Sequence, residues 1–417
     1  MVLIVIKNWL YFIVLTLAFH ATAFANPELV CENIYLHKPM DAYGKLKNSK
    51  LDILKDDHGK IQFTYSNELL NQSPIKNQDN VGTCHLHAWA SQLEFEAFLL
   101  HHKQITISTK YLNVMHWYNT SISALLDAAK NENWDVQLGT DIITSQQYIL
   151  LYGLMPESAW TAHTDFQVGV MAKRLDTYVR NIIARTKAKM DQTNNAETKT
   201  KLFNKAQSDI SKVFHGMIGD FAADFIYDGQ HYTTKSFMQK YFPFASNRQV
   251  YMSVKDEPLD KNSVFETQNA LVVKTNLDTI ENTIKQVIDS GHNVILSYDH
   301  NINFVDNATG IMSLSFFKYP KSANPLNRHL RKKFNIATND HGVVIVGYDL
   351  DRNTGKISRY KIKNSWGTEI GDHGYFHMYR DFLRTYVQAI NFSYDAKITL
   401  PINETKPEPS QLELDLH

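Results

Sequence analysis

Residues 74–90 read PIKNQDNVGTCHLHAWA, and the rest of the sequence is best interpreted from this stretch. Gly82 permits a tight turn just before Cys84, and apolar residues then recur every three or four positions from Thr83 to about Leu100, which predicts a helix. A cysteine in the first turn of a helix lies at the positive end of the helix dipole, where unpaired backbone N–H groups also point. Cys84 is therefore placed where a thiolate, the reactive form of cysteine, is stabilised.

Two distant stretches supply the partners that a cysteine nucleophile needs. Asp340-His341-Gly342 offers a histidine, which beside the thiol would form a thiolate–imidazolium pair and lower the thiol pKa. Lys363-Asn364-Ser365-Trp366-Gly367 offers an amide, which would hold the imidazole in one orientation. Gln78 and the backbone N–H of Cys84 would supply the two donors that stabilise a tetrahedral oxyanion.

Each of these residues taken alone has a more ordinary interpretation. A lone cysteine at a helix start is more often an inert core residue, and one of 18 histidines is usually a surface side chain. Trp366 is equally compatible with a plain core aromatic. The order and the joint presence of the three motifs favour the catalytic interpretation.

Together the motifs resemble those of papain-family cysteine peptidases. The run P-I-K-N-Q, five further residues and Cys84, with Glu94 ten residues later, is similar to the family's entry into its active-site helix. D-H-G-V-V-I-V-G-Y, Y-K-I-K-N-S-W-G and G-D-H-G-Y-F resemble its histidine and asparagine strands. The likeness covers roughly 71–160 and 260–395. It implies an α+β, papain-like two-lobe fold, with a helical lobe, a β-barrel-like lobe and a substrate cleft between them.

The resemblance also implies the role of each site residue. The implied catalytic residues are Cys84 as nucleophile, His341 as base, Asn364 as orienting group and Gln78 as oxyanion donor. The implied substrate-binding residues are Gly139, Thr140, Asp340 and Trp366, and Trp366 would also shield the hydrogen bond between asparagine and histidine from water. The implied reaction is hydrolysis of a peptide or protein substrate through an acyl-enzyme thioester, without a metal or organic cofactor.

Other functions stay open within this fold. Tyr152-Gly153-Leu154-Met155-Pro156-Glu157 and Gly374-Tyr375-Phe376-His377-Met378 also resemble the bleomycin-hydrolase branch, so an aminopeptidase, an amidase or a transpeptidase is an alternative. A catalytically silent binding protein is a further one.

The sequence departs from the family pattern at several positions near the cleft. His85 follows the nucleophile where the family usually has tryptophan, and His87 lies two residues further on. A metal site built from Cys84 and these two histidines is disfavoured, because neighbouring residues on a helix point in different directions. The other departures are Val81 in place of a half-cystine, Thr140 in place of a second glycine and Ile370 in place of a second tryptophan.

Two amphipathic patterns within 163–228 predict a pair of antiparallel helices joined by a polar loop at 191–197. This hairpin accounts for much of the extra chain between Cys84 and His341. We expect it to gate the cleft or to bind a regulator or partner.

The predicted domains are a signal peptide at 1–25, an N-terminal segment and possible short propeptide at 26–70, a helical lobe at 71–162, a helical hairpin insertion at 163–250, a β-rich lobe at 251–400 and a disordered tail at 401–417.

Composition and targeting signals limit the function classes. The chain has 43 lysine and arginine residues and 43 aspartate and glutamate residues, so it lacks the excess positive charge that is typical of nucleic-acid-binding proteins. Lys7, an apolar run and Ala23-Phe24-Ala25 predict a cleaved secretory signal, and therefore a periplasmic or extracellular protein without stable membrane insertion. With two cysteines only, Cys31 and Cys84, the fold depends on its core and not on a disulfide network, although one bridge between them stays possible.

Overall fold

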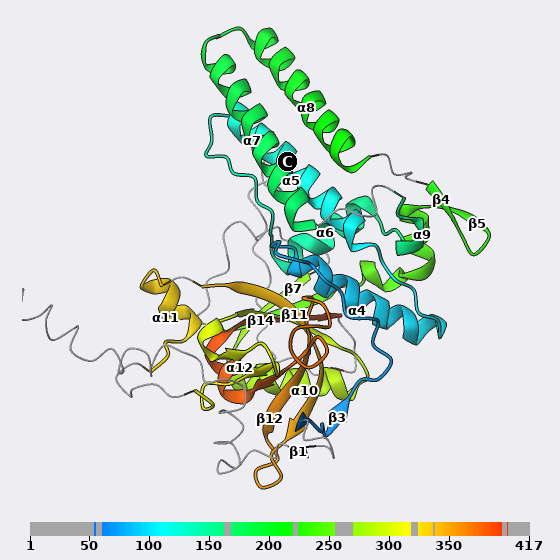
Figure 1. Ribbon diagram of the computed structural model, residues 1–417, viewed down its shortest axis with the longest axis vertical. Helices are drawn as coiled ribbons and strands as arrows, with labels where there is room; N and C mark the ends of the chain where they lie inside the picture. Colours follow the sequence, from blue (N-terminus) through cyan, green and yellow to red (C-terminus); the bar gives the residue numbers. More distant parts are fainter. Residues whose placement is uncertain are drawn as a thin grey trace, which may run out of the picture.

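The computed structural model describes residues 54–55, 61–161, 168–219, 224–254, 270–317, 324–336, 338–393 and 398. The predicted signal peptide at 1–25, Cys31 and the predicted tail at 401–417 lie outside these residues. In the part that is described, no helix is both long and apolar enough to cross a membrane. Figure 1 shows a group of helices stacked on a large sheet, which confirms the predicted α+β fold class.

The helical lobe consists of α4 (Cys84–His101), α5 (Thr109–Ala129) and α6 (Ile142–Tyr152). The apolar positions that predicted α4 are buried, including Leu86 and Trp89. The helix is also buried on its polar side, because it runs between the two lobes and packs against β11 of the sheet. Helix α6 ends at Gly153, whose φ of 78° favours glycine and whose Cβ would lie 2.5 Å from the Thr234 backbone.

The predicted helical hairpin is confirmed as α7 (Val168–Asp191) and α8 (Ala196–Ile218). The two helices pack on each other and on α5, at the end of the helical lobe that is far from the sheet (Figure 1). Asn195 caps α8 by accepting a hydrogen bond from the Thr198 backbone N–H. The residues on their buried stripes include Leu175, Val179, Ile183, Ala206, Ile210 and Phe214.

The predicted insertion at 163–250 contains more than this hairpin. A small antiparallel pair, β4 (Asp224–Tyr227) and β5 (Gln230–Thr233), follows it. Asp228 and Gly229 form the turn with φ values of 48° and 74°, and such positive φ values at both turn residues are what a tight two-residue hairpin requires. Helix α9 (Thr234–Tyr241) and a short 3₁₀ turn (Pro243–Ser246) then lead into the sheet.

The large sheet has the strand order β7-β6-β14-β8-β11-β12-β13-β10-β9. The sheet is open and does not close into a barrel. The predicted β-barrel-like lobe is therefore an open sheet that contains both parallel and antiparallel strand pairs. The three strands predicted around the histidine and asparagine motifs are confirmed as β11, β12 and β13. The elements of this lobe are β6 (Gln249–Val254), β7 (Ala270–Thr275), α10 (Leu277–Asp289), β8 (Val294–Asp299), β9 (Val305–Asp306), β10 (Ile311–Met312), α11 (Arg328–Lys333), β11 (Asp340–Leu350), β12 (Ile357–Lys363), β13 (Tyr375–Tyr379), α12 (Arg380–Tyr386) and β14 (Val387–Ser393).

The end of the N-terminal segment belongs to this sheet. Strands β1 (Leu54–Lys55) and β2 (Ile61–Gln62) pair with each other, and β3 (Asn67–Glu68) pairs with β11. The buried guanidinium of Arg359 on β12 lies 5.1 Å from the ring centres of both Phe63 and Tyr65. Residues 63–68 are therefore part of the folded body, whatever the fate of the chain that precedes them.

Candidate active site

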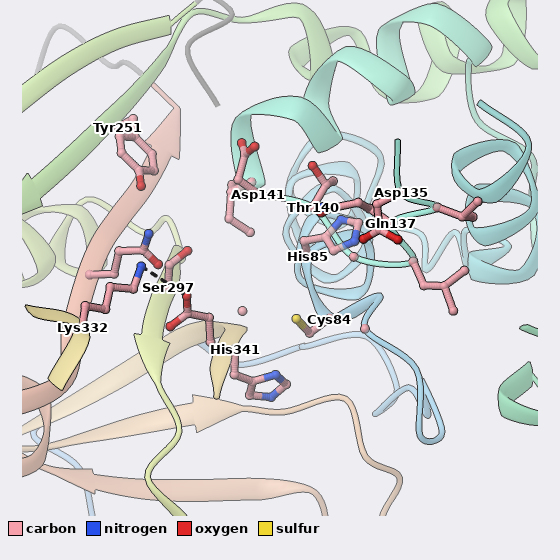
Figure 2. Close-up of a pocket in the computed structure, with 18 residues that line it drawn as sticks. Cys84, His85, Asp135, Gln137, Thr140, Asp141, Tyr251, Ser297, Lys332 and His341 are labelled. Atoms are coloured by element: carbon pink, nitrogen blue, oxygen red, sulfur yellow. Dashed lines mark ion pairs between the residues drawn. The ribbon is translucent and has the colours of Figure 1, made fainter. Parts of the chain in front are cut away.

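Cys84 is the first residue of α4, at the helix end that faces the sheet. Figure 2 shows its side chain beside that of His341, the first from α4 and the second from β11. Burial raises the pKa of the Cys84 thiol, whereas the backbone N–H groups of Gly342, His85 and Cys84 itself lower it. The sulfur thus sees the N–H donors that the helix start was predicted to offer, together with one from the histidine strand.

Strands β11 and β12 bring His341 and Asn364 together. Val344 pairs with Lys363 in the ladder, and Asn364 is the next residue after β12. His341 Nε2 and Asn364 Oδ1 are 2.8 Å apart, and the same Oδ1 accepts the Ser365 backbone N–H. Because a carbonyl oxygen only accepts, the imidazole proton is on Nε2, and Nδ1 keeps its lone pair for a second partner.

Aromatic rings enclose the imidazole of His341. The Trp366 ring stacks on it with centres 4.5 Å apart and planes 16° apart. The rings of Tyr298 and His300 approach edge-on, each at 5.8 Å. Burial lowers the pKa of His341 to about 4, while the hydrogen bond to Asn364 raises it. Trp366 therefore covers one face of the imidazole that bonds to Asn364, and Tyr298 and His300 approach the same ring edge-on.

Gln78 is buried and held by three hydrogen bonds. Its backbone N–H donates to the Ser365 carbonyl (2.8 Å), and its Oε1 accepts from the Ser365 hydroxyl (2.6 Å). Its Nε2 donates to the Val81 carbonyl at 2.6 Å, which leaves the second amide hydrogen for another acceptor. Lys76, two residues before Gln78, forms an ion pair of 2.6 Å with the buried Glu94 of α4.

A cavity of about 590 Å³ opens at the sulfur of Cys84, between the helical lobe and the sheet (Figure 2). The structure brings together five of the eight predicted site residues along it, namely Cys84, Gly139, Thr140, Asp340 and His341. Gln78, Asn364 and Trp366 are not part of this lining. Asn364 and Trp366 contact it through the hydrogen bond and the ring stack to His341, whereas Gln78 bonds to Val81 and Ser365 outside it.

Gly139 and Gly82 are in close backbone contact in the cavity wall. A Cβ at Gly139 would lie 2.8 Å from the Gly82 carbonyl oxygen, closer than side-chain carbons come to oxygen. The two segments can touch in this way because residue 139 is glycine, whereas a Cβ at Gly82 would lie at an ordinary 3.5 Å from Gly139. The contact fixes the Cys84 turn and the opposite wall relative to each other.

Asp340 lines the cavity and also forms ion pairs. Its carboxylate receives a two-point ion pair from the buried Arg328, with distances of 3.1 and 2.8 Å. Lys332 lies 3.7 Å from the same carboxylate. These ion pairs orient the start of β11. The Asp340 carboxylate still faces the cavity, but Arg328 and Lys332 already bind part of it. No sequence signal indicated Arg328, because it lies in a short helix twelve residues before its partner.

The two histidines after the nucleophile have different partners. His85 lines the cavity, and its Nδ1 is 2.7 Å from the Ser145 hydroxyl on α6. His87 points away and its Nδ1 bonds to the Thr83 carbonyl at 2.9 Å. Burial lowers the pKa of both, so both are neutral near pH 7. Across the described ranges, no three histidine, cysteine or acidic side chains gather as a metal site would require.

Comparisons with known proteins agree with this geometry. Residues 40–412 match the model of the peptidase C1-like family. A stretch of 90 residues is 32% identical to aminopeptidase W of Lactobacillus delbrueckii subsp. lactis and covers 21% of this chain and 20% of that protein. A stretch of 139 residues is 26% identical to mitochondrial cysteine proteinase 1 of Saccharomyces cerevisiae and covers 33% and 24% of the two chains. The matched stretches thus span about a fifth to a quarter of these relatives.

The crystal structure of PepW from Lactobacillus rhamnosis HN001 superposes with a TM-score of 0.66 at 17% identity, over 86% of this chain and 90% of that one. At this identity the likeness shows a shared fold. The family match extends over the helical lobe, the insertion and the sheet. The chain belongs to the peptidase C1-like family and has a papain-like fold.

Proposed function

We propose that this member of a peptidase family is a cysteine peptidase in which Cys84 and His341 carry out the chemistry. The observation that carries the proposal is the bond of 2.8 Å between His341 Nε2 and Asn364 Oδ1, because it leaves Nδ1 as the basic nitrogen beside the cavity that Cys84 lines. A base whose tautomer is set by a neighbouring amide is the arrangement that nucleophilic catalysis requires.

The protonation states of the two groups depend on each other. Burial raises the pKa of Cys84 and lowers the pKa of His341, so each group alone is neutral. Transfer of the thiol proton to Nδ1 creates both charges at once, and at short range in a poorly solvated site they stabilise each other. The nucleophile is therefore active as a thiolate–imidazolium pair, and removal of either partner leaves the other uncharged.

The reaction proceeds in two acyl-transfer steps. The Cys84 thiolate attacks the carbonyl carbon of a peptide bond, and the resulting oxyanion accepts hydrogen bonds from the free amide hydrogen of Gln78 and the Cys84 backbone N–H. His341 gives its Nδ1 proton to the leaving amine, which breaks the C–N bond and leaves a thioester. A water molecule then loses a proton to His341 and attacks the thioester, which releases a carboxylic acid and regenerates the thiol.

Mass spectrometry of the chain from residue 26 onward tests the proposal, with a peptidyl epoxide as the probe. We expect stoichiometric labelling of Cys84 in the wild type and none in Cys84→Ala, with labelling at least 100-fold slower in His341→Ala, as expected when a general base is removed (roughly 10²–10⁴-fold). His231→Ala is the matched control, because His231 is exposed on β5 and distant in the chain from every site residue. Labelling of His341→Ala at the wild-type rate would contradict the mechanism.

A second candidate, an aminopeptidase, is favoured by the stretch that is 32% identical to aminopeptidase W. The two activities are separated by matched fluorogenic peptides with a free or an acetylated amino terminus. Cleavage of the free peptide alone would establish exopeptidase action, and cleavage of both would establish an endopeptidase. Failure of a folded protein to cleave either peptide or to react with the epoxide would indicate a binding protein.

We further propose that residues 1–25 direct secretion and are removed. The proposal is supported by the charged start, the apolar run and the Ala-x-Ala site in the sequence. Intact-mass measurement of the protein secreted by a bacterial host should show loss of these residues. Retention of the full mass in the cytoplasm would refute the proposal.

A further inference from the structure

The cavity wall opposite His341 is a segment without regular structure. Residues 133–140 lie between α5 and α6, and six consecutive residues from Asp135 to Thr140 line the cavity. Their backbone groups make no hydrogen bond to the backbone of any other described residue. A segment of this kind takes its position from the side chains that hold it.

Three side chains from three helices hold the wall or Ile142, the first residue of α6 just after it. His116 of α5 bonds to the Leu138 carbonyl at 3.2 Å, and Trp89 of α4 donates to the Ile142 carbonyl at 2.7 Å. The third is Arg180 of α7, whose guanidinium donates to the Val136 carbonyl at 3.0 Å. The first two helices belong to the lobe itself, whereas α7 belongs to the inserted hairpin.

The Arg180 side chain is held by its own helix as well as by the wall. Its Nε donates to Asp176, one turn earlier on α7, at 2.7 Å. Its Nη2 forms an ion pair with Asp135 at 2.7 Å and the hydrogen bond to Val136. The planar guanidinium thus joins the helix to one wall side chain and one wall carbonyl, an arrangement that the single ammonium group of lysine cannot reproduce.

The start of α7 contacts the other side of the site. The backbone N–H of Gly169 donates to Asp79 Oδ2 at 3.0 Å, and Asp79 directly follows Gln78. A Cβ at Gly169 would lie 3.0 Å from the same oxygen, which is a tight contact. Gly169 and Arg180 are eleven residues apart, which is about 16 Å along a helix. One rigid helix therefore joins the Gln78 loop and the substrate-facing wall.

The described hairpin does not cover the cavity, since no residue of 168–219 lines it. We propose that α7 instead positions the wall that receives the substrate peptide, and that Arg180 is the positioning residue through which it acts. This inference rests on the proposed function, because the ligand held by the wall is taken to be the peptide substrate. The insertion then sets substrate affinity from outside the cavity and leaves the chemistry at Cys84 unchanged.

The test compares Arg180→Ala and Arg180→Lys with Arg185→Ala, an exposed arginine on the same helix. Each protein is labelled with increasing concentrations of a peptidyl epoxide, which separates the binding constant from the maximal rate at Cys84. Iodoacetamide, which is too small to need the wall, reports the reactivity of the thiol. Thermal unfolding reports whether each variant is folded.

We expect Arg180→Ala to weaken epoxide binding about tenfold, the effect of losing one hydrogen bond to a charged group. The maximal labelling rate and the iodoacetamide rate should stay at the wild-type values. Arg180→Lys should lie in between, and Arg185→Ala should match the wild type. A general loss of stability would instead lower the labelled fraction at every concentration.

Wild-type binding by a folded Arg180→Ala, or equal weakening in Arg185→Ala, would overturn the inference. If Arg180→Ala does not fold, Asp135→Asn removes the ion pair from the wall side at nearly constant size, and unchanged epoxide binding in that variant would overturn it equally. A wild type that shows no saturable labelling would overturn the proposed function, and this inference with it. The two failures are distinguishable, because only the second affects the unaltered protein.

Discussion

Replacing Gly139 with alanine should separate the two sides of the cleft. The added Cβ would lie 2.8 Å from the Gly82 oxygen, whereas ordinary contact begins at 3.4 Å, so the wall and the Cys84 turn must move apart by at least about 0.6 Å. The obstacle is backbone, which cannot rotate aside as a flexible side chain would. Since misplacement of about 1 Å can cost roughly 100-fold in rate, we expect kcat/KM to fall by about 10- to 100-fold.

The assay measures kcat/KM on a fluorogenic peptide, normalised to active sites by epoxide titration, together with the melting temperature. Gly216→Ala is the matched control, because no atom lies within 4 Å of its added Cβ and it is on helix α8. That variant should keep full activity and gain up to about 1 kcal/mol of stability from the helix propensity of alanine. Wild-type kcat/KM in Gly139→Ala would refute the argument that this contact fixes the cleft.

Three further predictions concern the supports of the site. Asn364→Ala should lower kcat by about 10- to 1000-fold with little change in KM, because the tautomer of His341 is no longer fixed; an unchanged kcat in steady-state kinetics would contradict this. Burial lowers the pKa of Lys363 to about 7, so the unfolded chain binds more protons between pH 7 and 10. Wild type should therefore gain stability relative to Lys363→Met as the pH rises from 7 towards 10, by at most about 5 kcal/mol, and urea unfolding of both proteins across this range would show the gain. A chain that starts at residue 71 should melt well below one that starts at residue 61, because it lacks β3 and the aromatic rings over Arg359, and equal melting temperatures would show that 61–70 is dispensable.

The sequence predicted those parts of the molecule that local pattern determines. The glycine turn and the apolar spacing after Cys84 gave the start of α4 within one residue. The resemblance of the stretches around His341 and Asn364 to the family's strands predicted β11 and β12, and the pairing of these strands is what places the two side chains within hydrogen-bond distance. The sequence thus predicted the positions of residues that lie within one helix or one strand.

The contacts of Arg180 that were missed join segments that are far apart in the chain. The sequence neighbourhood of Arg180 contains nothing that indicates Asp135 or Val136 as partners. The Asp228-Gly229 turn was a recognisable local signal that went unused. Helix α5 was also missed, although it is the surface on which the hairpin packs.

The bond between Gln78 and Ser365 has a consequence for the order in which the protein is made. The two residues are 287 positions apart, and His341 and Asn364 also come from the last quarter of the chain. During synthesis Cys84 emerges early, whereas the strands that carry its partners emerge late and must then pair over long loops, which is a slow step in folding. We expect the nascent chain to carry an ordinary thiol until β12 has docked, and iodoacetamide labelling of chains cut before residue 357 would show whether it does. The producing cell would then meet a reactive cysteine only in a protein that is already complete.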